Sequence, residues 1–182
     1  PVVLSQVQTF NGPDFVTTRQ RDANADGFQL TMQEEEALNG GMHAVETLGW
    51  VAIEAGSATA GALTLLAGQA GGVTDAATPV GFGSDLGAQA LTLAQLSSFA
   101  GADPAWARGS AQSGTGFTVS AEEDTSVDTE VRHTEETVDY FVFSDTGSLG
   151  RAPQQAVLET GVTTLTDATS TVTLTTTFLN PV

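Results

Sequence analysis

Residues 4–14 read LSQVQTFNGPD, and residues 93–103 read LAQLSSFAGAD. The two stretches align without a gap and share the spacing of their phenylalanine, glycine and aspartate. Self-similarity at a long fixed period is the mark of a repeat architecture. The chain therefore holds two copies of one structural unit, spaced by about 90 residues. Whatever one unit does is expected of its twin, which argues against a single unique active site.

Polar residues recur with the same period. After one inserted residue, HAVETLGW of residues 43–50 returns as HTEETVDY of residues 133–140. The recurrent polar residues are Arg19, Glu34, His43 and Glu46 in the first unit and Arg108, Glu123, His133 and Glu136 in the second. These eight residues are the candidates for a role shared by both units.

We interpret Glu34 and its twin Glu123 as carboxylates on the apolar side of a strand. Glu34 falls in the same strand phase as Phe28 and Leu30, and alternate residues of a strand share one face. A buried charge is normally paired, and the arginine of the same unit is the obvious partner. The sequence thus favours structural Arg–Glu pairs near the sheet edge, with the histidine donating a hydrogen bond. Sugar contact is one alternative, and a metal site or catalysis is another.

Alternation of apolar and polar residues with a period of two is frequent, and helical periodicity is scarce. Residues 28–33 and 117–122 alternate in this way, and each run follows a glycine suited to a turn. Residues 50–53 and 140–143 are the most apolar runs and are expected to form central, buried strands. Short strands separated by turn signals are typical of β-sandwiches. We predict an all-β fold of two tandem antiparallel β-sandwich domains.

The segment between the two cores has a counterpart at the C-terminal end. GVTDAATPV of residues 72–80 parallels LTDATSTV of residues 165–172. Each unit is thus expected to consist of leader strands followed by a core. This predicts a first sandwich core at 1–56, a second sandwich with leader and core at 57–150, and leader strands of a further unit at 151–182.

We expect the C-terminal leader strands to complete a core that has no leader of its own, such as the first one. They could fold back within the chain, or they could serve another copy, covalently in a longer array or by strand donation. We favour another copy because folding back past a whole unit requires a long crossing connection. The residues expected in this assembly strand and at its receiving edge are Val172, Leu174, Phe178, Pro181, Pro1 and Val3. The predicted partners are copies of the same chain, joined head to tail.

The composition is strongly acidic. Among 182 residues there are 22 aspartates and glutamates, five arginines, no lysine and no cysteine, for a formal net charge of −17. Such a surface repels phosphate backbones, which argues against nucleic acid as a partner, and it suits surroundings rich in salt or calcium. Residues 55–74 carry no charge but are interrupted by polar residues and glycines, so we predict no membrane span.

The core of each unit resembles the H-type lectins. The matching elements are PVVL at residues 1–4, Arg19 eight residues before Gly27 and Phe28, Arg108 eight residues before Gly116 and Phe117, and the closing runs at residues 49–53 and 139–143. The resemblance implies a six-stranded antiparallel sandwich that assembles into trimers and binds N-acetylgalactosamine-type sugars. It also implies an arginine and a loop histidine as glycan contacts, which here are Arg19, His43, Arg108 and His133.

One motif suggests calcium. Asp22, Asn24 and Asp26 precede Gly27 with the spacing D-x-N-x-D-G, which aims alternate oxygens at one point. The glutamate that completes such a loop is expected where Gln33 stands, and the second unit has no carboxylates there. A plain turn rich in aspartate and asparagine is the simpler interpretation, so we predict no cofactor and keep calcium as an alternative.

We predict from the sequence that the protein is not an enzyme. One histidine per unit cannot supply a multi-histidine zinc site, and no serine lies in a G-x-S-x-G motif. Because PVVL at residues 1–4 already has the pattern of a strand, we expect a piece of a longer protein. We expect that protein to be extracellular or on the cell surface, and to be bacterial. Its expected function is that of a structural repeat assembling into a filament, stalk or adhesin array. The alternative is a tandem lectin that uses the two equivalent arginines.

Overall fold

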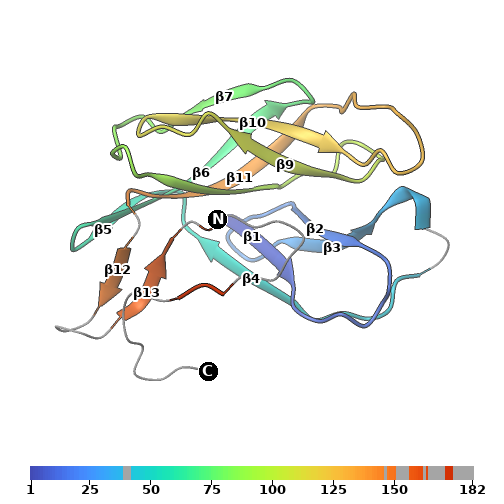
Figure 1. Cartoon of the computed structure of the whole chain (residues 1–182), viewed down its shortest axis with the longest axis horizontal. Coiled ribbons are helices and arrows are strands. Elements are labelled where there is room, and N and C mark those ends of the chain that lie inside the picture. Colours follow the sequence, from blue (N-terminus) through green and yellow to red (C-terminus); the bar gives the residue numbers. More distant parts are fainter. Residues whose placement is uncertain (39–41, 146, 151–155, 162, 164–170, 174–182) are drawn as a thin grey trace.

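The computed structural model describes residues 1–38, 42–145, 147–150, 156–161, 163 and 171–173. These residues form strands and one short 3-10 helix, η1 (Glu36–Leu38) (Figure 1). The prediction of an all-β protein is therefore confirmed.

Residues 56–143, which we call the second half, form two antiparallel sheets that contribute to one hydrophobic cluster. The four-stranded sheet has the order β5 (Gly56–Ala60), β6 (Leu63–Val73), β11 (Glu136–Phe143), β8 (Leu91–Leu96). The three-stranded sheet has the order β7 (Thr78–Gly81), β10 (Gly116–Glu123), β9 (Ala105–Ser110). Figure 1 shows β7, β10 and β9 as a layer above β6 and β11.

The core between these two sheets follows from the period-2 pattern of the strands. Phe117 and Val119 of β10 are buried at alternate positions, and so are Val138, Tyr140 and Val142 of β11. They belong to one hydrophobic cluster to which both sheets contribute. The layout of two complete sandwich domains goes beyond these contacts and remains a prediction.

The first half of the chain repeats the pairings of the core strands. β1 (Val2–Val7) pairs with β4 (Leu48–Ile53) as β8 pairs with β11, and β2 (Val16–Arg21) pairs with β3 (Gln29–Glu34) as β9 pairs with β10. Among the described residues, no strand pairs with the second edge of β4 or of β3. At the corresponding edges β11 has β6 and β10 has β7.

An aromatic pair recurs inside both halves. Phe117 and Tyr140 meet edge to face with ring centroids 5.5 Å apart, and Phe28 and Trp50 do the same at 5.5 Å. Tyr140 is 7% exposed, but Trp50 is 59% exposed. The difference follows from the strands around them, because β4 has no described neighbour in the place that β6 takes beside β11.

The leader strands cover the aromatic pair of the second half. Phe82, just after β7, stacks on Phe117 with centroids 6.0 Å apart. Gly68 of β6 leaves room for Tyr140, since a Cβ at that glycine would lie 2.3 Å from the tyrosine hydroxyl oxygen. The leader thus supplies both an apolar side chain and a gap that fits an aromatic ring.

β12 (Gly147–Gly150) and β13 (Ala156–Thr160) form a hairpin that repeats the start of the leader. Gly147 stands opposite Thr160, as Gly56 stands opposite Ala67. Of the residues predicted for the assembly strand, Val172 is described and is 61% exposed. Leu174, Phe178 and Pro181 lie outside the described residues.

The two halves of the chain are packed against each other. Phe141 and Phe143 point away from the core of the second half, because they alternate with Tyr140 and Val142 along β11. On that outer face they form a second hydrophobic cluster with Val2 of β1. The N-terminal strand therefore lies on the outside of the four-stranded sheet.

Candidate functional site

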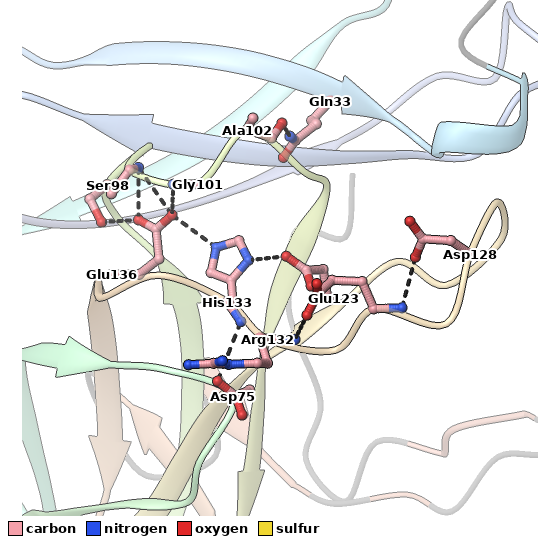
Figure 2. A network of polar contacts seen from close by, with 12 residues as sticks. Gln33, Asp75, Ser98, Gly101, Ala102, Glu123, Asp128, Arg132, His133 and Glu136 are labelled. Atoms are coloured by element: carbon pink, nitrogen blue, oxygen red, sulfur yellow. Dashed lines mark hydrogen bonds and ion pairs between the residues drawn. The ribbon is translucent and has the colours of Figure 1, made fainter.

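The recurrent polar residues of the second unit form a buried Glu–His–Glu chain (Figure 2). Nδ1 of His133 lies 2.7 Å from Oε1 of Glu123, and Nε2 lies 3.0 Å from Oε1 of Glu136. Glu123 ends β10 and Glu136 begins β11, so the three hydrogen-bonded side chains connect the two sheets at one end. All three side chains are at most 3% exposed.

Glu136 is the most heavily bonded of these groups. It accepts hydrogen bonds from the backbone N–H of Gly101 at 3.0 Å, from the Ser98 hydroxyl and from the guanidinium of Arg19. Burial raises its pKa, but the bonds from Gly101, Ser98 and His133 together with the positive charge of Arg19 lower it to about 2. Glu136 is therefore a stable carboxylate.

A glycine is required where the His133 ring meets the loop of the repeated motif. A Cβ at Gly101 would lie 2.5 Å from Cε1 of His133, and a Cβ at Gly12 would lie 2.5 Å from Cε1 of His43. The recurrence of Gly12 as Gly101 thus has a physical cause, because a glycine lets the histidine ring approach the backbone.

The first unit repeats this Glu–His–Glu arrangement. Nδ1 of His43 lies 2.8 Å from Oε1 of Glu34, and Nε2 lies 3.3 Å from Oε1 of Glu46. A hydrogen bond from the Thr9 hydroxyl is the main cause that lowers the pKa of Glu46 to about 2, with further bonds from the backbone of the same loop. Glu46 thus stays charged without a bonded arginine among the described residues.

The predicted pairing of Arg19 with Glu34 is wrong, because Arg19 crosses to the other unit. Its Nη2 lies 2.5 Å from Oε1 of Glu136 and donates to the carbonyl of Ser98 at 2.9 Å. The Arg19 side chain is 1% exposed, and its guanidinium lies 4.5 Å from the centre of the Phe99 ring. Glu34 is instead bonded to the histidine of its own unit.

Arg108 also has a partner other than the predicted one. It pairs with Glu122, which also accepts a hydrogen bond from Nε1 of Trp106 at 2.7 Å. Neighbouring residues of a strand point to opposite faces, so Glu122 points outward and Glu123 points inward to the histidine. The Arg108 side chain is 63% exposed, which distinguishes it from Arg19.

Side chains of the second unit also bind the backbone of β1, a contact that sequence reasoning missed. The N–H of Val3 donates to Oδ2 of Asp139 at 2.7 Å. The N–H of Ser5 donates to Oε1 of Gln95 at 2.7 Å, and Nε2 of Gln95 donates to the carbonyl of Ser5 at 3.0 Å. The amide of Gln95 therefore takes the place of a neighbouring strand. Its repetition as Gln6 was the available signal, but the acceptor is backbone, which carries no sequence pattern.

The four residues predicted to contact glycan lie in different surroundings. Arg19 and His133 are buried and bonded to carboxylates, and the ring of His43 has a glutamate at each nitrogen. Arg108 alone of the four has a largely exposed side chain. Glycan binding through these residues stays a prediction.

The predicted calcium loop forms an exposed turn between β2 and β3. Oδ1 of Asn24 accepts the N–H of Asp26 at 2.8 Å, and its Nδ2 donates to the carbonyl of Asp22 at 3.1 Å. This is the arrangement of a plain Asx turn, and calcium binding here stays a prediction. A different group, Asp14 with Glu34 and His43, has its potential ligand atoms within 4.8 Å of one another. Sequence analysis placed Asp14 in the repeated stretch but did not propose it as a metal ligand.

An open groove of about 610 Å³ lies where the two units meet. Its lining includes Trp50 and Val51 of β4, Leu93 of β8 and Trp106 of β9. Trp50, Val51 and Leu93 are each more than half exposed. Contiguous exposed apolar side chains of this kind mark interaction surfaces.

Comparison with known proteins gives one informative similarity. The chain is similar to halomucin of Haloquadratum walsbyi (strain DSM 16790 / HBSQ001). The two sequences are 33% identical over 146 residues, which is 79% of this chain and 2% of halomucin. No protein-family model matches the chain, and no solved structure matches it. The resemblance to H-type lectins thus has no support from a family match.

The similarity bears on two earlier expectations. It agrees with a repeat-containing extracellular protein, but the relative is archaeal and lends no support to a bacterial origin. In the part of the chain that the structure describes, no helix has the length and apolarity needed to cross a membrane.

Proposed function

We propose that this chain is a structural repeat module of a long extracellular surface protein, in which units stand head to tail and complete one another by strand pairing. Halomucin is an extracellular surface protein, and the chain spans about 2% of its length. The duplication, the lysine-free acidic composition and the presence of the same polar chain in both units support a structural role over an enzymatic one.

The uncovered aromatic pair of the first unit carries this proposal. Trp50 is 59% exposed at the position where Tyr140 is 7% exposed, although each meets its phenylalanine at the same distance. The second edge of β4 has no strand partner among the described residues. An unpaired strand edge next to an exposed aromatic side chain is a template for one more strand.

The C-terminal segment has the features that the leader needs. The register of β12 with β13 aligns Gly161 with Gly68, the glycine that makes room for Tyr140. A leader strand that paired with β4 as β6 pairs with β11 would place Gly161 under Trp50. Val172 aligns with Val80, which is 8% exposed, whereas Val172 is 61% exposed. Both the donor segment and the acceptor edge therefore keep apolar surface that pairing would bury.

Trp50 fluorescence tests this proposal. In a Trp106→Phe variant Trp50 is the sole tryptophan, since the chain has two. We expect its emission to shift to shorter wavelength as protein concentration rises, or when a separate peptide of residues 147–182 is added in excess. Val172→Asp, a change at an exposed residue, should abolish the concentration-dependent shift while leaving the circular dichroism spectrum unchanged.

Two results would contradict the proposal. Emission that stays at long wavelength with both concentration and peptide means that the edge of β4 does not accept a leader. Emission already at short wavelength and independent of concentration means that the C-terminal segment folds back within its own chain.

Glycan binding remains the second candidate because one groove combines aromatic and polar side chains. Trp50 and Trp106 line it together with Gln6, Gln8 and Thr17, and an aromatic face beside amide and hydroxyl groups suits a sugar ring. A glycan array should then give binding that Trp50→Ala removes. If no glycan on the array binds, the glycan proposal fails and strand pairing remains the proposed use of the groove.

A further inference from the structure

We propose that Arg108 of one copy of this chain docks into a socket on the first unit of a second copy, formed by Phe10 and Glu46. This contact would repeat the one that Arg19 makes inside the chain. It rests on the proposed self-association and adds to it a second interface, which does not involve the leader strands.

The contact inside the chain defines what such a socket needs. Arg19 of the first unit lies over the ring of Phe99 and against the carboxylate of Glu136, and it donates to the Ser98 carbonyl. A cation over an aromatic face and a charge-assisted bond to a fixed carboxylate add to each other when both are shielded from water. Gln33 holds the other end of the guanidinium, with Nη1 3.0 Å from its Oε1.

The first unit carries the same pair of groups with no arginine over them: Phe10 is exposed, and the Glu46 side chain beside it is 1% exposed. Phe10 corresponds to Phe99 and is 83% exposed, whereas Phe99 is 38% exposed beneath its arginine. Glu46 corresponds to Glu136 and is held in the same way, by the backbone N–H of Asn11 at 2.6 Å and of Gly12 at 3.0 Å. Its carboxylate is ionised and oriented, yet none of the arginines in the described residues contacts it.

The second unit carries the matching arginine. Arg108 corresponds to Arg19 and projects from β9 with its side chain 63% exposed. Glu122 corresponds to Gln33 and binds Nε of Arg108, which leaves the two terminal nitrogens for another carboxylate. The arginine is thus held in place before the second copy arrives, which lowers the entropy lost on docking.

A second pair of groups supports the same docking. Gln95 clamps the N–H and the carbonyl of Ser5 inside the chain. The counterpart of Gln95 is Gln6, which is exposed, and the counterpart of Ser5 is Ala94 on the outer strand β8. Gln6 of the second copy would therefore clamp the backbone of Ala94 in the first. Exposed Leu93, beside Ala94, would be covered at the same time.

Two differences make the contact between copies weaker than the one inside the chain. Gly49 stands where Asp139 binds the N–H of Val3, and Gly109 stands where Gln20 binds the carbonyl of Val3. These hydrogen bonds have no counterpart between copies. The intrachain contact therefore forms in every folded molecule, whereas the contact between copies depends on protein concentration.

The geometry predicts open chains of copies. Each copy has its arginine on the second unit and its socket on the first, so the interface is heterologous and propagates unless the rotation closes a ring. Each copy also has a formal charge of −17, and the repulsion between copies must be screened. The Debye length falls to about 3 Å at 1 M salt, so molar potassium chloride is the appropriate medium.

Sedimentation velocity of two exposed-site variants tests the inference. Arg108→Glu removes the arginine but keeps the socket, and Phe10→Glu blocks the socket but keeps the arginine. We expect the wild type to form a series of oligomers and each variant to weaken association by roughly tenfold or more. With Val172→Asp added to both variants to remove strand pairing, an equimolar mixture of the two should form a dimer and nothing larger. Arg21→Glu, at another exposed arginine, should behave as the wild type.

The outcomes separate this inference from the proposed strand pairing. If both variants associate like the wild type and Val172→Asp does not, strand pairing stands and the arginine socket is overturned. If the two variants are impaired and Val172→Asp associates normally, the socket stands without strand pairing. A wild type that remains monomeric in molar salt at millimolar concentration overturns both.

Discussion

Arg19 and Arg108 occupy the same position of the repeat and have different energetic roles. Arg19 is 1% exposed and bonded to an equally buried glutamate, while Arg108 forms a surface pair. Removing one partner of a buried pair leaves an uncompensated charge in a medium of low polarity, whereas exposed pairs are solvated and screened. The duplication thus provides a matched comparison within one molecule.

We expect Arg19→Ala to lower the free energy of unfolding by about 3–5 kcal/mol. Arg108→Ala should lower it by at most about 1 kcal/mol. Chemical denaturation of dilute, monomeric protein measures both values. Equal effects of the two substitutions would contradict the burial of the Arg19 pair.

Because the pKa of Glu136 is lowered, the stability of the folded protein depends on pH in the acid range. Its pKa in the folded protein is about 2, below the ordinary value of 4.5, so the unfolded chain binds the proton more readily. The stabilisation is fully present above pH 4.5 and is lost as the pH falls toward 2. We expect the melting temperature of the wild type to approach that of Glu136→Gln across this window. A difference between the two proteins that does not change with pH would contradict this assignment.

At the scale of the elements, β1 is held by side chains in place of a second strand. Gln95 satisfies both backbone groups of Ser5, and Asp139 binds Val3. Buried backbone groups that lose such partners are costly, because water does not replace them. The attachment of β1 to the second unit therefore depends on a few amide and carboxylate groups.

We expect Gln95→Ala to destabilise the protein by about 1–3 kcal/mol and to speed hydrogen exchange at the amide of Ser5. Its counterpart Gln6 is exposed, so Gln6→Ala should change the stability of the monomer by less than about 0.5 kcal/mol. Exchange at Ser5 that is as slow in Gln95→Ala as in the wild type would show that the clamp is dispensable.

For the whole molecule, the decisive property is a net charge of −17 carried by a two-unit β structure. Like charges oppose the compact state, and added salt screens those at the surface far more than those in the interior. Salt should therefore stabilise the protein without altering the contribution of the Arg19 pair.

We expect the melting temperature to rise when potassium chloride increases from about 0.1 M to about 1 M. The difference between the wild type and Arg19→Ala should remain the same in both solutions, because the pair is buried. Differential scanning calorimetry measures both quantities. A melting temperature that falls with salt would contradict dominant surface repulsion.

The duplication, the all-β class and the recurrent Arg, Glu and His residues are determined by the sequence alone. They are visible there because strands impose a period of two, and because a glycine, a histidine and two glutamates must recur wherever the same buried chain is built. Comparing the repeats could show that Arg19 and Glu136 matter, but it could not show that they meet.

Only the tertiary structure decided the partners. Equivalent residues suggest pairs within one unit, whereas β1 and β2 lie against the second unit and carry Arg19 to Glu136 and Ser5 to Gln95. Such contacts join residues that are 90 or more positions apart and include backbone atoms, which have no sequence signature. The side of a sheet on which a neighbouring strand packs depends on the whole fold. Because β1 and β2 pack against the second unit, Arg19 is buried and structural, whereas Arg108 at the equivalent position is exposed.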